Sequence, residues 1–307
     1  MYNSFAGICC FFLVSISAFS QQDSKLRYKD LVFESVIISK NIKYTTHSPS
    51  GKEKYSLLDI YEAKDDNNTL RPLITWMHGG GFKYGKKTSN GTPIWSKTFA
   101  QRGYVCAAIN YRLSKKKPLR KFPDLVEGCM EAIQDVQAAI SFFKKNSDKY
   151  RIDTNHIILA GNSAGAITAL QAVYSSQYDL AKMINREGYD SLDRSYNSQN
   201  VFAVISFWGA ILDSTWLQNA KVPVVMVHGS KDKIVSPESK GPVNGSKVIF
   251  RNTTTHGIPA ALKLYDGFGH ELQKSFNPLW AGSKTKKRWL EAGQFAADFL
   301  YENMNRH

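Results

Sequence analysis

Gly161-Asn162-Ser163-Ala164-Gly165 is the stretch on which the fold prediction rests, because of what stands on either side of it. The apolar run 156–161 leads into it and is typical of a buried strand, while residues 163–176 have helical spacing. A serine between a strand and a helix, with glycine two residues away on each side, indicates a tight, strained turn that exposes the hydroxyl group. We therefore predict that Ser163 is a nucleophile at the start of a helix, whose dipole favours developing negative charge.

A second glycine-rich motif, His78-Gly79-Gly80-Gly81-Phe82, follows the apolar run 72–78. Glycines at such a place let backbone N–H groups point at an oxyanion without a clash of side chains. We predict that Gly80 and Gly81 donate two such groups and that Ala164 donates a third. A phosphate-binding loop is not indicated, because the lysine and hydroxyl residue that a P-loop requires do not follow the glycines.

The predicted general base is His270, in Gly267-Phe268-Gly269-His270. A glycine-flanked loop after a strand, here 261–266, lets an imidazole approach a serine closely. His228 ends the apolar run 222–228 and remains the alternative.

The predicted orienting acid is Asp232, which follows the run 222–228 by a short loop. Such an acid fixes the tautomer of the imidazole and stabilises the imidazolium. Asp213 and Glu238 remain as rivals, because a triad is defined by geometry rather than by position.

The chain order serine, aspartate, histidine is typical of the α/β-hydrolase fold and differs from the orders used by other serine hydrolases. We predict a mostly parallel central sheet flanked by helices in one domain, residues 21–307. The polar segment 177–200 interrupts the alternation of strands and helices. We expect there either a small cap over the pocket or a plain surface loop. The predicted strands are 31–39, 55–61, 72–78, 104–110, 156–161, 201–207, 222–228 and 261–266, and the main predicted helices are 124–145, 163–176 and 286–303.

The chain of 307 residues has a formal net charge of +14. The densest basic clusters are Lys115–Lys117 with Arg120 and Lys121, and Lys284 with Lys286–Arg288. Aromatic residues are not interleaved with these clusters as they are in single-strand binders, so we expect no nucleic-acid partner. A solvated basic surface is the plainer interpretation, and a membrane surface or an anionic polysaccharide is the functional one.

The first twenty residues contain no charged side chain, and Gly7 to Phe19 form an apolar run. The run is short for a bilayer span and fits the apolar region of a secretory signal. Ala18-Phe19-Ser20 provides a small-x-small cleavage site. We therefore expect residues 1–20 to be a signal peptide, the protein to be secreted or periplasmic, and no stable insertion into a membrane.

Cysteine usage predicts neither a metal site nor a disulfide framework. Cys9 and Cys10 lie in the predicted signal peptide, which leaves Cys106 in a predicted strand and Cys129 in a predicted helix. We expect two buried free thiols, with a single disulfide as the alternative. No Cys-x-x-Cys or His/Cys ligand spacing occurs, and we expect no cofactor.

Together, these motifs resemble those of secreted bacterial carboxylesterases related to hormone-sensitive lipases and to the feruloyl and acetyl-xylan esterase group. The resemblance covers roughly residues 55–300 and includes Asn110-Tyr111-Arg112-Leu113. It implies a metal-free serine mechanism on a small or medium acyl ester, with carbohydrate esters among the candidates. The chain departs from the stricter hormone-sensitive-lipase pattern at Asn162, where that group has an acid, and at Ala166, where it has a glycine.

Aromatic residues near the motifs are the predicted substrate contacts. We expect Phe82, Tyr84 and Trp208, together with segment 177–200, to line the acyl and alcohol pockets. The alternative for these aromatics is a place in the core, because large aromatic side chains are mostly buried. A lipase, a serine peptidase and a non-catalytic binding module of the same fold are the competing functions. The oligomeric state is left open.

Overall fold

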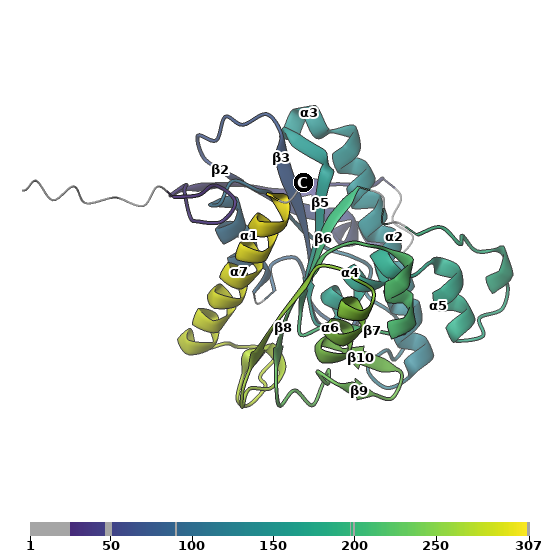
Figure 1. Cartoon of the computed structure of the whole chain (residues 1–307). Coiled ribbons are helices and arrows are strands. Elements are labelled where there is room, and N and C mark those ends of the chain that lie inside the picture. Colours follow the sequence, from purple (N-terminus) through teal and green to yellow (C-terminus); the bar gives the residue numbers. More distant parts are fainter. Residues whose placement is uncertain (1–24, 47–50, 90, 197, 199, 306–307) are drawn as a thin grey trace, which may run out of the picture.

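The computed structural model describes residues 25–46, 51–89, 91–196, 198 and 200–305. The predicted signal peptide therefore lies outside the described residues. The main sheet has eight strands in the order β1-β2-β4-β3-β5-β6-β8-β11 (Figure 1). These strands are β1 Val36–Lys43, β2 Leu57–Ala63, β3 Arg71–Met77, β4 Val105–Ile109, β5 Ile152–Asn162, β6 Val201–Phe207, β8 Val224–Gly229 and β11 Ala260–Tyr265.

The sheet is mostly parallel, as the sequence predicts. Only β2 runs against its neighbours, pairing antiparallel with both β1 and β4, while the strands from β4 to β11 pair in parallel. Seven strands lie within a few residues of their predicted positions. The exception is β1, which was expected at 31–39 and lies at Val36–Lys43. This edge strand is largely exposed, so its sequence lacks the apolar signal that locates buried strands.

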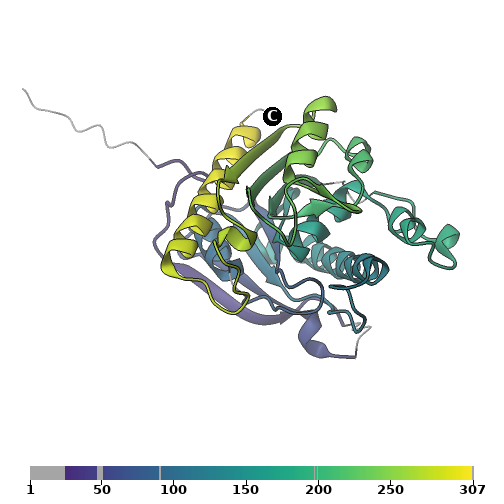
Figure 2. The same ribbon diagram turned by 90° about the horizontal axis from the view of Figure 1, so that it is seen from below.

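Helices cover both faces of the sheet (Figure 2). On one face lie α1 Thr92–Ala100 and α7 Ser283–Met304, and on the other lie α2 Phe122–Lys145, α4 Ala164–Tyr174 and α6 Ser246–Thr255. Each face has its own apolar core, and successive side chains of β3 point alternately into one core and the other. Leu73 and Met77 belong to the core beneath α2 and α4, whereas Ile74 and Trp76 belong to the core beneath α1 and α7. Central strands buried on both faces explain the near-continuous apolar runs of the sequence.

Several short elements were not predicted. The helices α1 and α6 lie in stretches where the sequence predicts no element, and a small second sheet has the order β7-β10-β9. These elements are short or polar, so their periodicity is weak. The remaining elements are η1 Glu53–Ser56, α3 Ser147–Tyr150, α5 Gln177–Met183, η2 Tyr189–Ser191, β7 Ala210–Ile211, η3 Ser214–Asn219, β9 Ser239–Lys240, β10 Val243–Gly245 and η4 His270–Leu272.

The two cysteines of the described chain are buried free thiols, as predicted. Cys106 on β4 belongs to the core beneath α1 and α7, while Cys129 on α2 belongs to the core on the other face. The sheet separates them, which excludes a disulfide. Burial raises the pKa of both thiols. Among the described residues, no helix is long and apolar enough to cross a membrane.

A very close backbone approach lies between β3 and the start of α4. A Cβ atom on Gly165 would stand 2.1 Å from the carbonyl oxygen of Met77, which is backbone and cannot move away. We expect Gly165→Ala to lower the free energy of unfolding by at least about 3 kcal/mol, as severe overpacking does.

Gly188→Ala is the matched control. Nothing lies within 4 Å of a Cβ atom there, although its φ of +72° still opposes a side chain. Its expected cost is about 1 kcal/mol. Urea unfolding followed by circular dichroism would measure both variants, and equal destabilisation would contradict the steric argument.

Candidate active site

Ser163 occupies the turn between β5 and α4 that the sequence predicts. Its φ is +52° and its ψ −119°, a conformation that a residue with a side chain rarely adopts. Strain of this kind costs on the order of 1–3 kcal/mol and persists only where the surroundings enforce it. The enforcement comes from both sides of the turn, because Ser163 donates its backbone N–H to the carbonyl of Phe207 on β6 and accepts from Ile167 in α4.

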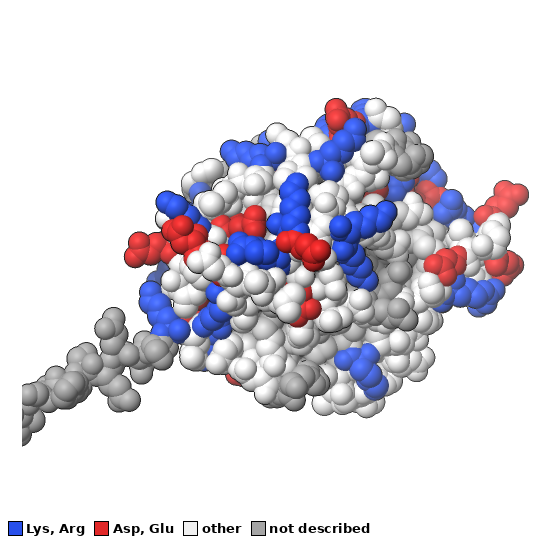
Figure 3. Space-filling model, turned by 90° about the horizontal axis from the view of Figure 1, so that it is seen from above, with Lys and Arg blue, Asp and Glu red and all other residues white. Residues whose placement is uncertain are grey.

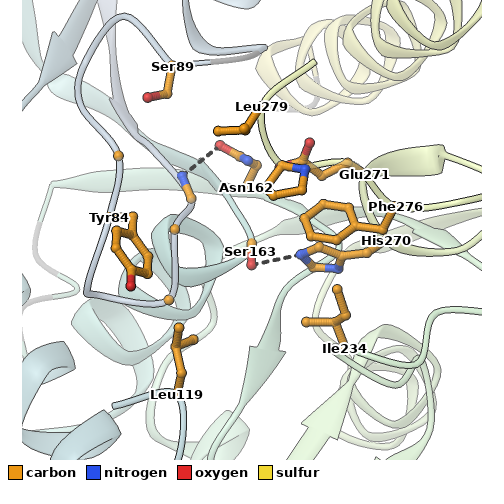
Figure 4. Close-up of a pocket in the computed structure, with 15 residues that line it drawn as sticks. Tyr84, Ser89, Leu119, Asn162, Ser163, Ile234, His270, Glu271, Phe276 and Leu279 are labelled. Atoms are coloured by element: carbon orange, nitrogen blue, oxygen red, sulfur yellow. Dashed lines mark hydrogen bonds between the residues drawn. The ribbon is translucent and has the colours of Figure 1, made fainter. Parts of the chain in front are cut away.

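His270 and Asp232 lie in line with this serine. The Nδ1–H of His270 donates to Oδ2 of Asp232 over 2.7 Å. The hydroxyl of Ser163 donates to Nε2 of His270 over 3.0 Å, as Figure 4 shows. With Nδ1 carrying the proton, Nε2 presents its lone pair to the serine. All three side chains are less than a tenth exposed. The three residues thus form a hydrogen-bonded relay from a carboxylate to a hydroxyl group.

The carboxylate of Asp232 accepts three hydrogen bonds and lies near a second imidazole. Oδ1 accepts from the backbone N–H groups of Ile234 and Val235. Oδ2 accepts from His270 and lies 3.4 Å from Nε2 of His228. Burial alone would raise the pKa of Asp232, but the neighbouring imidazoles of His228 and His270 outweigh burial and hold that pKa well below its usual range. Asp232 therefore stays ionised and aimed at the imidazole.

The rivals that the sequence left open have other partners. His228 is fully buried behind Asp232, where it donates from Nε2 to the carbonyl of Val235 and accepts from the hydroxyl of Ser246. Asp213 accepts from the backbone and hydroxyl of Thr215 at the start of η3. The third rival, Glu238, pairs with Lys247 and Arg251. None of the three rivals is hydrogen-bonded to the side chain of Ser163.

The glycine loop after β3 faces Ser163. Gly80 has a φ of +118° and a Cβ there would stand 2.2 Å from the carbonyl oxygen of Tyr84, so only glycine fits. Its neighbour Gly79 donates its N–H to the side chain of Asn162, which ties the loop to the serine turn. Within the described residues, the N–H groups of Gly80, Gly81 and Ala164 donate no backbone hydrogen bond. These groups remain available to an oxyanion, as the helix N-terminus at Ala164 also favours.

His78 supports the glycine loop from beneath. Its Nδ1–H donates to the carbonyl of Gly79 over 2.7 Å, and its ring stacks on Tyr111 at 4.2 Å between centroids. The hydroxyl of Tyr111 donates to the carbonyl of His78. Complete burial lowers the pKa of His78 to about 4, so the ring is neutral at physiological pH.

A cavity of about 600 Å³ opens over Ser163. Its lining is mostly apolar and contains Gly79, Gly80, Gly81, Tyr84, Gly85, Ser89, Leu119, Asn162, Ser163, Ile234, His270, Glu271, Phe276, Pro278 and Leu279. Tyr84 lines the cavity as predicted. Phe82 and Trp208 do not line it. Both are fully buried, Phe82 in the core beneath α2 and α4 and Trp208 in the core beneath α1 and α7. The alternative of core aromatics therefore applies to these two.

The cavity wall comes from loops whose role the sequence did not reveal. Leu119 precedes α2, Ile234 follows β8, and Phe276 and Leu279 follow β11. No described residue of segment 177–200 lines the cavity. That segment forms α5 and η2 and packs beside α2, at the right of Figure 1. Such loop residues carry no periodic signal, so only the folded chain brings them together.

The described residues contain no group of three or more His, Cys, Asp or Glu side chains arranged to hold a metal ion. Sheet order, strained serine turn and relay together define an α/β-hydrolase. Residues 58–215 match the BD-FAE family model, and the chain belongs to that family.

Comparisons with individual proteins agree with this assignment. Esterase LipC of Mycobacterium tuberculosis is 33% identical over 115 residues, which cover 38% of this chain and 26% of LipC. Arylacetamide deacetylase of Oryctolagus cuniculus is 26% identical over 68% of this chain and 56% of its own length. The chain thus spans about a quarter to just over half of these relatives.

Among solved structures, esterase 2 of Thermogutta terrifontis phosphorylated by paraoxon superimposes with a TM-score of 0.60. It is 18% identical, over 86% of this chain and 94% of that one. Esterase B of Lactobacillus rhamnosis, inhibited by a tributyrin phosphonate, gives a TM-score of 0.58 at 16% identity and covers 90% of each chain. These likenesses establish the fold.

The neutral, buried His78 predicts a pH dependence of stability. The unfolded imidazole has a pKa near 6.5, whereas the folded one titrates at about 4. Between these values the unfolded chain binds the extra proton, so the free energy of unfolding falls as the pH falls from about 6.5 to 4. The loss that this one group contributes is about 3 kcal/mol at most.

His78→Phe retains a ring against Tyr111 but cannot titrate. We expect it to be less stable than the parent at pH 7, because the bond to Gly79 is lost, and to lose less stability on acidification. Urea unfolding of both proteins at pH 7 and near pH 4 would measure the difference. Equal losses of stability in the two proteins would contradict the role of His78.

Proposed function

We propose that this protein is a serine carboxylesterase that acts through Ser163, His270 and Asp232. The observation that carries the proposal is the unbroken relay from Asp232 through His270 to Ser163 at the floor of an open cavity. A histidine and a serine that served only to pack the core would need neither a strained backbone at the serine nor three nearby N–H groups that donate no backbone hydrogen bond. Both features are those of acyl transfer through a tetrahedral intermediate.

The reaction proceeds in two halves. His270 accepts the hydroxyl proton of Ser163 at Nε2 while the serine oxygen attacks the ester carbonyl. His270 then passes that proton to the leaving alcohol, and an acyl-serine remains. In the second half, His270 takes a proton from water, the resulting hydroxide attacks the acyl-serine, and Ser163 recovers its proton. Asp232 stays ionised throughout and stabilises the imidazolium.

Charge on the carbonyl oxygen develops toward the glycine loop. The N–H groups of Gly80, Gly81 and Ala164 are the donors that we assign to it, and each such donor contributes about 3 kcal/mol to the lowering of the barrier. Because the loop is fixed by His78 and Asn162 before substrate arrives, little reorganisation is needed at the moment of reaction.

A small or medium acyl ester is the substrate that the site favours. The cavity volume of about 600 Å³ lies in the range of small-molecule sites. Carbohydrate esters are a narrower proposal, supported by the family resemblance of the sequence motifs. Export to a secreted or periplasmic location is likewise a proposal, and its support is the apolar run between Gly7 and Phe19.

The nucleophile is tested by Ser163→Ala on a series of p-nitrophenyl esters from acetate to palmitate. We expect the parent to hydrolyse short chains and the variant to lose about 10⁴-fold or more in kcat. Circular dichroism should show an unchanged fold, because alanine removes only one atom from the turn. Hydrolysis by the variant close to the parent rate would contradict the assignment, and a folded, inactive parent would favour a binding function.

The choice of acid is tested by a matched pair of substitutions. Asp232→Asn should lower kcat by about 10⁴-fold, because an amide donates to His270 and imposes the wrong tautomer. Asp213→Asn should leave kcat within a few-fold of the parent, because that residue contacts only Thr215. Steady-state kinetics with p-nitrophenyl butyrate would measure both, and a reversed order of effects would assign the acid to Asp213.

A further inference from the structure

Exposed apolar side chains surround the mouth of the cavity. Leu279 is 91% exposed and its neighbour Trp280 is 68% exposed. Tyr84, Leu119, Ile234 and Phe276, which line the cavity, are each more than a third exposed. We call these six residues the rim. Contiguous apolar surface on a soluble protein marks a place that another apolar phase covers.

The rim comes from four separate segments, and each of them is basic. Segments 83–87, 115–121, 231–234 and 273–288 carry lysines and arginines around the rim residues. The one acidic residue in all four is Asp232, which is buried in the relay. The two densest basic clusters of the sequence, which the proposed esterase chemistry leaves unused, are among these segments.

Part of this charge has a structural partner, and most of it has none. Lys83 donates to the carbonyls of Ser114, Lys115 and Lys116, Lys87 pairs with Asp59, and Lys116 pairs with Glu127. The following exposed lysines of the four segments make no ion pair within the described part of the chain: Lys86, Lys115, Lys117, Lys121, Lys231, Lys233, Lys274, Lys284, Lys286 and Lys287.

The position of the lysines on α7 is unfavourable for the helix itself. Its first turn has no acidic residue and contains Lys284 and Lys286, and its last turn has no basic residue. The helix dipole favours the opposite distribution of charge. Helix stability therefore does not account for these lysines, whereas an anion outside the protein would.

The opposite face of the molecule is different. The loops after β8 and β11 lie at the lower edge of Figure 1, and Figure 3 views the molecule from above, away from them. There, acidic and basic side chains are interspersed. In the four rim segments, by contrast, the single acidic side chain is that of the buried Asp232.

We propose that the rim and its basic segments dock the protein on an anionic lipid surface, with the cavity mouth facing the lipid. The apolar rim residues would enter the boundary between headgroups and acyl chains, where tryptophan and tyrosine are favoured. The lysines would contact the anionic headgroups. A lipid surface accounts for the rim better than an anionic polysaccharide does, because Leu119, Ile234 and Leu279 have no ring on which a sugar can stack. The docking surface is distinct from the catalytic relay.

Sedimentation with phosphatidylcholine vesicles, with and without phosphatidylglycerol, tests the proposal on the full chain. The parent should bind the anionic vesicles more tightly, and added salt should weaken that binding. The double substitution Lys284→Glu with Lys286→Glu should weaken it by about tenfold or more, because each basic residue near the surface contributes about fivefold. Leu279→Ser with Trp280→Ser should also weaken it.

The matched controls lie at the other end of the sheet. Lys64→Glu and Leu70→Ser replace exposed residues between β2 and β3, and both should bind as the parent does. Ser163→Ala should also bind as the parent does, so the result does not depend on ester hydrolysis. The parent and all variants share the apolar run between Gly7 and Phe19. Differences in vesicle binding between them therefore report on the rim and its basic segments.

Three results would overturn the proposal. Binding that is the same for the rim variants, the lysine variants and the parent would assign it to the N-terminal run. Equal binding to neutral and anionic vesicles would remove the role of the lysines. Retention on an anionic polysaccharide without vesicle binding would replace the lipid surface by a polymer.

Discussion

The parallel pairing of β3 with β5 is the interaction on which the rest of the site depends. Its register sets Met77 beside Gly161, so the glycine loop and the serine turn leave the sheet side by side. Gly165 then lies against the carbonyl of Met77 at a distance that no side chain would permit. Close approach of two backbones thus replaces side-chain packing at this point. The strain at Ser163 is held there by the sheet and α4 together, and the glycine loop is held beside it by His78 and Asn162.

The charge states of the buried groups in the site follow from their burial together with their hydrogen-bond partners. Asp232 is withdrawn from water, which by itself would favour its neutral form, yet two backbone N–H groups and two imidazoles keep it ionised. The second imidazole, His228, is anchored in turn by Ser246 and the carbonyl of Val235. His78 shows the converse case, because a buried ring with a carbonyl partner stays neutral. Burial with satisfied partners therefore fixes the charge state of both groups.

Open access to the cavity connects the chemistry with the surface. The wall is made by loops after β8 and β11 and before α2, while the segment expected as a cap packs beside α2. Without described cap residues over it, the mouth exposes leucine, isoleucine and aromatic side chains. Those side chains are costly to leave in water. The same loops carry the basic residues, so the region that admits substrate is also the one suited to an anionic, apolar interface.

The sequence by itself determined the features that depend on local backbone or on burial. Glycines around Ser163 and after His78 specify turns that only glycine permits, and buried strands appear as apolar runs. The fold class, the tight turn at Ser163 and the glycine loop were therefore predictable. Only the tertiary structure shows that His270 rather than His228, and Asp232 rather than Asp213, is hydrogen-bonded in line with Ser163, because these residues are far apart in the chain. It also moved Phe82 and Trp208 into the core and brought Leu119, Ile234 and Phe276 to the cavity. Loop residues carry no period, and where they meet is decided by the packing of the whole sheet.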